Sequence, residues 1–135
     1  MRAKFINEDI KNIFKPKSEE EIWSSVGSLD PNQLLRKSAE NGFLPGVNKA
    51  LERGADVHAE KGYALRYASQ YGYYDIVALL LDNGADVHAN KDEALRYASS
   101  NGHYDIIALL LDNGANVHAG DDWALRSASR YSHYD

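Results

Sequence analysis

Three histidines recur at a spacing of thirty residues and are the first candidates for chemistry in this sequence. Each stands in the local sequence V-H-A: His58, His88 and His118. Histidine nitrogens are common zinc ligands, so such a column raises the question of a metal site. Three serines recur with the same spacing: Ser69, Ser99 and Ser129. The repeated sequence places no base beside these serines, and the glycines form no G-x-x-x-x-G-K phosphate loop, so neither pattern indicates catalysis.

These spacings belong to a repeat that covers most of the chain. Residues 61–90 and 91–120 differ at only eight of thirty positions and align without a gap. The same frame extends back to Leu34 and begins again with "WALRSASRYSHYD" at Trp123. Self-similarity at this period predicts a solenoid, in which each unit buries its apolar face against its neighbours.

Composition narrows the class of protein. Apolar residues make up 44% of the 135 residues and charged residues 26%, which is typical of a globular chain. Cysteine is absent, which excludes disulfides and thiolate metal sites and fits an intracellular, cytoplasmic location. The longest apolar run, "IIALLL", is much shorter than the roughly 20 residues of a membrane helix. The net charge of −5 argues against binding to nucleic acid, and nothing indicates a membrane partner.

Each repeat is predicted to contain two helices. Small and apolar residues between Ala64 and Ser69 form one helical stripe, and Gly72 ends that helix. A second helix carries Asp75 in its first turn and ends at Gly84. The segment "IVALLL" of this helix is apolar almost all round, so we expect neighbours to cover it on both sides. The predicted fold class is therefore all-α.

The repeated unit resembles the ankyrin repeat, whose pattern runs T-P-L-H-x-A-A, G-H, I/V-V-x-L-L-L and G-A-D-V-N-A. "ALRYAS", "GHYDIIALLL" and "GADVHA" correspond to these blocks over residues 31–135. The resemblance implies a helix-turn-helix solenoid with repeats at 31–60, 61–90 and 91–120 and a partial repeat at 121–135. Three features depart from the family: a period of 30 instead of 33, alanine for proline, and arginine for histidine. The missing residues fall before "ALR", so the family's projecting hairpin is expected to be a shortened turn. Such short-period arrays look similar to those of large DNA viruses.

The resemblance also bears on the histidines. Equivalent atoms in adjacent repeats of this family lie about one helix-packing distance apart, about 8–10 Å. A column with that spacing cannot share one metal at about 2.1 Å from each nitrogen. We therefore expect no metal and no cofactor, and we expect each histidine to bond to neighbouring backbone at the position of the family's turn asparagine. His103 and His133 follow the G-H position and are expected to be structural.

Four arginines fall in register: Arg36, Arg66, Arg96 and Arg126. Stacked like charges repel each other unless they are partnered. Carboxylates of the adjoining turns, such as Asp56, Asp86 or Asp92, are the expected partners. We therefore favour a structural hydrogen-bonding role for these arginines over the alternative of an anion site.

Residues 1–30 do not repeat and are predicted to form an N-terminal helical cap. One helical face collects the apolar residues of the first segment, which Pro16 ends: Phe5, Ile6, Ile10, Ile13 and Phe14. A capping box of Ser18 and Glu21 opens a second helix with an apolar stripe: Ile22, Trp23, Val26 and Leu29. Asp30 followed by Pro31 predicts the start of the first repeat helix. A separate partner-binding helix is the alternative for this segment.

Positions at which the repeats differ suggest a binding surface. Six of the eight differences fall in the turn or at the end of the first helix, regions that line the concave, partner-binding surface in the ankyrin family. Tyr, Trp and Arg at such positions are frequent interface hot spots. Free drift of solvent-facing residues is the alternative explanation. The resulting candidate partner-binding residues are Tyr63, Gln70, Tyr71, Asp92, Glu93, Ser100, Asn101, Asp122, Trp123, Arg130 and Tyr131.

The sequence therefore predicts a non-catalytic protein–protein interaction module, located in the cytoplasm, or in host cytoplasm if the source is viral. The alternative is an assembly element that self-associates or continues into a longer array. This alternative rests on Asp135, which aligns with Asp75 and Asp105, so the fourth copy has no second helix. Incomplete cover of the C-terminal face is then expected at Leu109, Leu110 and Leu125. An enzyme using the histidine or arginine column is the least favoured class.

Overall fold

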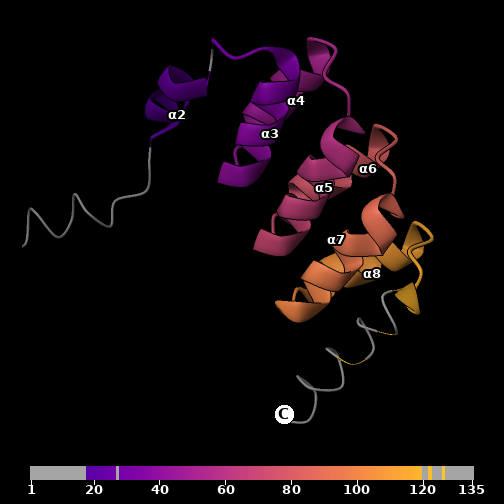
Figure 1. Ribbon diagram of the computed structural model, residues 1–135. Coiled ribbons are helices and arrows are strands. Elements are labelled where there is room, and N and C mark those ends of the chain that lie inside the picture. Colours follow the sequence, from indigo (N-terminus) through magenta and orange to yellow (C-terminus); the bar gives the residue numbers. More distant parts are fainter. Residues whose placement is uncertain (1–17, 27, 120–121, 123–125, 127–135) are drawn as a thin grey trace, which may run out of the picture.

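The computed structural model describes residues 18–26, 28–119, 122 and 126, and all regular elements among them are helices. In chain order they are α2 (Glu19–Val26), α3 (Pro31–Asn41), α4 (Leu44–Glu52), α5 (Ala59–Tyr71), α6 (Tyr74–Asp82), α7 (Ala89–Ser100) and α8 (Tyr104–Asp112). The first helices of the repeats, α3, α5 and α7, stack in one layer, and α4, α6 and α8 stack behind them (Figure 1). The predicted all-α helix-turn-helix stack is confirmed.

The helix ends follow the predicted signals. Asp30 caps α3 by accepting a hydrogen bond of 2.9 Å from the backbone N–H of Gln33, whose side chain accepts one of 3.3 Å in return, and Pro31 is the first helical residue. Gly72 ends α5 in the left-handed conformation (φ 82°), and Gly84 follows α6 with φ 86°. A side chain disfavours these backbone angles, so glycine fixes where both helices end.

The connection between repeats is a left-handed turn that leads directly into the next first helix. Three consecutive residues near the start of each of these helices have positive φ: Glu60, Lys61 and Gly62 in α5, and Asn90, Lys91 and Asp92 in α7. Non-glycine residues in this conformation cost roughly 1–2 kcal/mol each. The shortened turn is as predicted, but its left-handed backbone is not, and it needs other groups to hold it in place.

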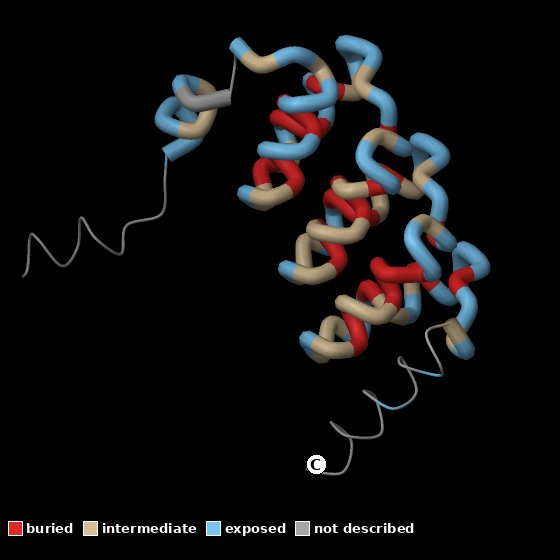
Figure 2. The backbone as a smooth tube through the Cα atoms, viewed as in Figure 1, coloured by how far each residue is buried: buried red, intermediate tan, exposed pale blue. Residues whose placement is uncertain are grey.

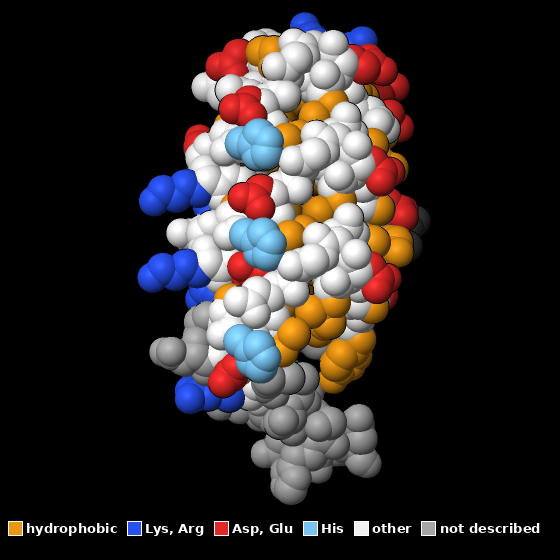
Figure 3. All heavy atoms as spheres, turned by 90° about the vertical axis from the view of Figure 1, so that its right-hand side faces the viewer, with side chains coloured by type: hydrophobic (Ala, Val, Ile, Leu, Met, Phe, Trp, Pro, Cys, Tyr) orange, Lys and Arg blue, Asp and Glu red, His pale blue; other side chains and the backbone are white. Residues whose placement is uncertain are grey.

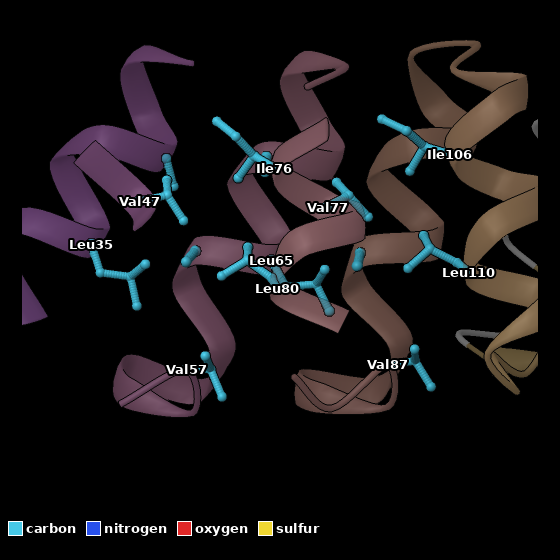
Figure 4. Packing of buried hydrophobic residues seen from close by; sticks show 14 of the residues in the cluster. Leu35, Val47, Val57, Leu65, Ile76, Val77, Leu80, Val87, Ile106 and Leu110 are labelled. Carbon is cyan, nitrogen blue, oxygen red and sulfur yellow. The ribbon is translucent and has the colours of Figure 1, made fainter. Parts of the chain in front are cut away.

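One continuous core runs through the stack between the two helical layers (Figure 2). Leucines in register from the first helices meet aliphatic residues of the second helices (Figure 4). Those at most 2% exposed include Leu35, Leu65, Leu95, Val47, Val77, Leu80, Ile106 and Leu110. Each repeat thus buries its apolar face on the next, as a solenoid requires.

The cover of the second helices agrees with expectation in part. Leu79 and Leu81 are half-buried and pack against the core, so the side of α6 that carries them is covered less completely than the side that carries the buried Ile76, Val77 and Leu80. The expectation of incomplete cover is wrong for Leu110, which is fully buried, and agrees with Leu109, which is half-buried. Leu125 lies outside the described residues.

Helix α2 packs at the start of the stack. Ser18 and Glu21 form the predicted capping box. The backbone nitrogen of Ser18 lies 3.1 Å from the Glu21 carboxylate, and the backbone nitrogen of Glu21 lies 3.2 Å from the Ser18 hydroxyl oxygen. The Trp23 ring meets Phe43 edge to face, with ring centres 4.9 Å apart. Ile22 and Leu29 also pack against the core. The predicted helix of residues 1–16 lies outside the described residues, as does the side chain of Val26. Within the part of the chain that the structure describes, no helix is long and apolar enough to cross a membrane.

Candidate interaction surface

A row of tyrosines runs along the outer side of α5. Tyr63, Tyr67 and Tyr71 are spaced four residues apart and therefore share one side of the helix. The rings of Tyr63 and Tyr67 stack with their centres 4.1 Å apart, and those of Tyr67 and Tyr71 lie 6.1 Å apart. Tyr97 of α7 meets Tyr67 edge to face at 6.5 Å, so the row continues onto the next repeat. We call these four residues the tyrosine cluster.

The tyrosine cluster is accessible to solvent. Tyr71 is 50% exposed, and the other three are half-buried, whereas Leu65 and Ala68 on the opposite side of α5 are fully buried. The rings support one another by stacking and edge contacts, which reduces the side-chain entropy that a partner would have to remove on binding. Ordered aromatic side chains of this kind are suited to contact with a partner.

At the first repeat boundary, Tyr63 is held by charged groups of α3. Its hydroxyl donates a hydrogen bond to Glu40, and the Arg36 guanidinium lies over its ring, 4.8 Å from the ring centre. Burial alone would raise the pKa of Glu40, but the Tyr63 hydroxyl and the charges of Lys37 and Arg36 hold that pKa below its usual value. Burial and the bond to Glu40 together raise the pKa of Tyr63. The tyrosine cluster is therefore anchored to the preceding repeat.

At the second boundary, an ion pair takes the place of the tyrosine contact. Arg66 donates to Glu93 across 2.6 Å, and the two side chains are only 13% and 9% exposed. Burial works to raise the pKa of Glu93, but hydrogen bonds from Tyr97, Asn90 and Arg66 lower it overall. The bond to Glu93 in turn raises the pKa of Tyr97. Glu93 occupies the register position of Tyr63, so the same position links adjacent repeats by different chemistry.

Two arginines of the column, Arg66 and Arg96, hold the left-handed turns. Arg66 donates to the backbone carbonyls of Lys61 and Glu60, both at 3.1 Å, and Arg96 donates to those of Lys91 and Asn90, both at 3.3 Å. One planar guanidinium can reach both carbonyls, which the histidine of the family pattern could not do in this geometry. The predicted structural hydrogen-bonding role is confirmed for Arg66 and Arg96.

The predicted partners of the arginines are wrong. Among the described residues, the ion pairs of this column go to glutamates: Glu40, Glu60 and Glu93. Asp56 and Asp86 instead accept bonds of 2.9 and 2.8 Å from the backbone N–H groups of His58 and His88 within their own turns.

Asp92 and Glu93, two of the predicted surface residues, lie inside the molecule. Asp92 is 4% exposed, and its carboxylate accepts a bond of 2.6 Å from the backbone N–H of Asn116. Glu93, taken as a whole residue, is 7% exposed, and its carboxylate pairs with Arg66. Asn32 makes the bond equivalent to that of Asp92, at 2.8 Å to the N–H of Asp56. These side chains join repeats to each other, so we leave Asp92 and Glu93 out of the candidate surface.

The other predicted surface residues divide into three groups. Tyr71, Asn101 and Asp122 are exposed, whereas Tyr63, Gln70 and Ser100 are half-buried. Trp123, Arg130 and Tyr131 lie outside the described residues. Tyr67 and Tyr97 also belong to the candidate surface. Differences between the repeats do not predict them, because both repeats carry tyrosine at this position.

The histidines also have defined places. The ring nitrogen Nδ1 of His88 lies 3.1 Å from the Asp92 carboxylate, and that of His118 lies 2.7 Å from Asp122, so their side chains bond to carboxylates and not to backbone as expected. His103 Nε2 lies 2.9 Å from the carbonyl of Gln70 in the preceding repeat, which confirms its predicted structural role. His133 lies outside the described residues. No group of three metal-binding side chains occurs in the residues that the structure describes.

A pocket of about 250 Å³ opens beside Tyr63, between α3 and the start of α5. Its walls include Asn32, Arg36, Glu60 and Tyr63. Arg36 and Glu60 form an ion pair in this wall, with 3.6 Å between their nitrogen and oxygen atoms.

Cationic side chains are most prominent along one edge of the molecule. Lys and Arg side chains project there, Asp and Glu side chains lie beside a row of histidines next to them, and further Asp and Glu side chains lie along the opposite edge (Figure 3). The exposed Lys61 and Lys91 lie in the left-handed turns at the start of α5 and α7. The exposed acidic residues of the second helices are Asp75, Asp82, Asp105 and Asp112.

Comparison with known proteins agrees with this architecture. A family model described as ankyrin repeats (3 copies) matches residues 35–121. No curated protein matches the chain.

Proposed function

Since the chain belongs to the ankyrin repeat family, whose repeats generally mediate contacts between proteins, we propose that it is a non-catalytic module that binds a partner protein. The binding surface is the outer side of the first helices α5 and α7. The observation that carries this proposal is the tyrosine cluster, an ordered and accessible group of four aromatic side chains on two adjacent repeats.

The composition of this surface supports a protein partner. Tyrosine buries a large area and loses little side-chain entropy, which is why it is frequent at interface hot spots. Polar groups surround the cluster at Gln70, Ser100 and Asn101, as in the rim of a typical interface. The proposed surface also includes the remaining predicted residues: Asp122, which is exposed, and, from their register in the repeat, Trp123, Arg130 and Tyr131.

Affinity capture with matched variants tests this function. The chain is immobilised, exposed to an extract of the organism that encodes it, and compared with two double variants. Tyr67→Ala with Tyr71→Ala alters the tyrosine cluster, whereas Tyr74→Ala with Tyr104→Ala removes two exposed tyrosines of the second helices, which are 40% and 57% exposed. A partner that binds as proposed is retained by the wild type and the second pair and lost by the first. Equal retention by both pairs would refute the proposed surface.

Two further expectations remain proposals. Residues 1–30 form a cap on the first repeat, and the Trp23–Phe43 contact supports this assignment for α2. The protein acts in the cytoplasm, which imaging of a fluorescent fusion in the source cell tests. The residues that would carry the alternative of self-association through the fourth copy lie mostly outside the described part of the chain.

A further inference from the structure

We infer that the partner segment is acidic and extended, with a carboxylate at about every third residue. This inference rests on the proposed function and adds the chemistry of the partner to it. It comes from the charges at the N-terminal ends of the helices that carry the tyrosine cluster.

Lys61 and Lys91 are cations without a partner in the described part of the chain. Both side chains are exposed, and no carboxylate among the described residues lies within ion-pair distance of either. The nearest exposed carboxylate in sequence, Glu60, faces Arg36 at 3.6 Å instead. Arg96, in the same region, also has no carboxylate partner among the residues described. Two adjacent repeats thus present positive charge that the protein itself does not neutralise.

These cations stand out because the chain as a whole is acidic. The net charge is −5, and exposed aspartates occupy the second helices α6 and α8. The carboxylates near Lys61 and Lys91 are already engaged within the protein: Glu60 faces Arg36, Asp56 and Asp86 accept backbone N–H groups of their own turns, and Asp92 accepts the N–H of Asn116. The two lysines therefore attract an acidic segment to the N-terminal ends of the helices that carry the tyrosine cluster, whereas the exposed aspartates of α6 and α8 repel it.

The repeat geometry sets the spacing of the partner's charges. Lys61 and Lys91 occupy equivalent positions in adjacent repeats, and packed helices lie about 8–10 Å apart. A polyproline II segment rises about 3.1 Å per residue with three residues per turn, so every third side chain returns to the same side after about 9 Å. Alternate residues of a β-strand are only about 6.6 Å apart, a poorer match. Surfaces lined with aromatic rings also favour polyproline II segments, because proline rings pack against them.

The same surface is less suited to nucleic acid. Binding to a nucleic acid needs many cations that neutralise successive phosphates, and the negative edge of this molecule opposes a polyanion. Lys61 and Lys91 together offer two charges at a separation much larger than that of neighbouring phosphates. A short acidic polypeptide, with few and widely spaced charges, fits this distribution.

A peptide titration tests the inference. The probe is a fluorescein-labelled peptide of six Glu-Pro-Pro units, followed by fluorescence anisotropy with the full chain. We expect saturable binding that weakens with added salt. Lys61→Gln with Lys91→Gln should weaken it about tenfold. The matched control, Lys49→Gln with Arg53→Gln, removes the same charge from exposed positions in and after α4 and should change the affinity less than twofold. Thermal melts confirm that all variants are folded.

Three results would overturn the inference: no saturable binding, equal weakening by the two double variants, or tighter binding of a peptide with Lys in place of Glu. An oligothymidylate of similar length is included, and tighter binding of that probe would also overturn it. A peptide of alternating Glu and Pro, which places its charges at the wrong spacing, should bind more weakly. If these tests fail while capture still depends on Tyr67 and Tyr71, the proposed function stands and only the chemistry of the partner is wrong.

Discussion

Replacing Arg66 by alanine should destabilise the protein far more than the same change at Arg96. Both arginines hold a left-handed turn through two backbone carbonyls. Only Arg66 also pairs with a buried carboxylate among the described residues, that of Glu93 at 2.6 Å. Loss of the two carbonyl bonds should cost about 1–2 kcal/mol. Leaving Glu93 buried without its cation raises the total for Arg66→Ala to about 3–5 kcal/mol.

Urea unfolding, followed by circular dichroism, measures this difference. With a slope of about 2 kcal/mol per molar urea, the midpoint of Arg66→Ala should lie about 1–1.5 M below that of Arg96→Ala. Adding Glu93→Ala to Arg66→Ala should recover part of the loss, because it removes the unpaired carboxylate. Equal unfolding midpoints for the two single variants, or a further loss of stability on adding Glu93→Ala, would show that the Arg66–Glu93 pair does not stabilise the protein in this way.

Leu80→Ala should cost about 2–5 kcal/mol in the same assay because it opens a cavity at a fully buried position, whereas Tyr71→Ala should change stability by less than about 1 kcal/mol. Ser69→Ala and Ser99→Ala should each leave stability unchanged or raise it by up to about 1 kcal/mol, because the buried hydroxyls have no hydrogen-bond partner among the described residues. A clear loss of stability would show that these hydroxyls do form a hydrogen bond. The lowered pKa of Glu93 means that its contribution to stability is complete above the unfolded value of 4.5 and is lost as the pH falls through its folded value. Glu93→Gln should therefore be less stable than wild type at pH 7, and the difference should shrink at pH 3.

The helices and the stack could be predicted because their signals are local and repeated. Gly72 and Gly84 end helices where the sequence indicated, and the apolar register of Leu65 places it in the core. The left-handed turns could not be predicted in the same way. Glu60 and Lys61 have no intrinsic preference for positive φ, and the conformation depends on the arginine that follows them.

The candidate surface was harder to predict because residues at equivalent positions of two repeats can differ for two reasons: each residue matches its neighbour in the preceding repeat, or the position is free on the surface. Tyr63 and its counterpart Glu93 differ because each suits the repeat before it, Tyr63 meeting Glu40 and Glu93 meeting Arg66. The sequence alone does not separate such paired changes from changes at a free surface. Tyr67, in contrast, has the tyrosine Tyr97 as its counterpart in the next repeat, so differences between the repeats do not identify it.

The most direct test of the central claim is hydrogen–deuterium exchange of the chain, alone and with a captured partner. We expect slower exchange on binding in α5 and α7, most clearly in the segments that hold the tyrosine cluster, with exchange in α6 and α8 unchanged. Slower exchange confined to α6 and α8, with α5 and α7 unaffected, would contradict the claim that this protein binds its partner through the first helices.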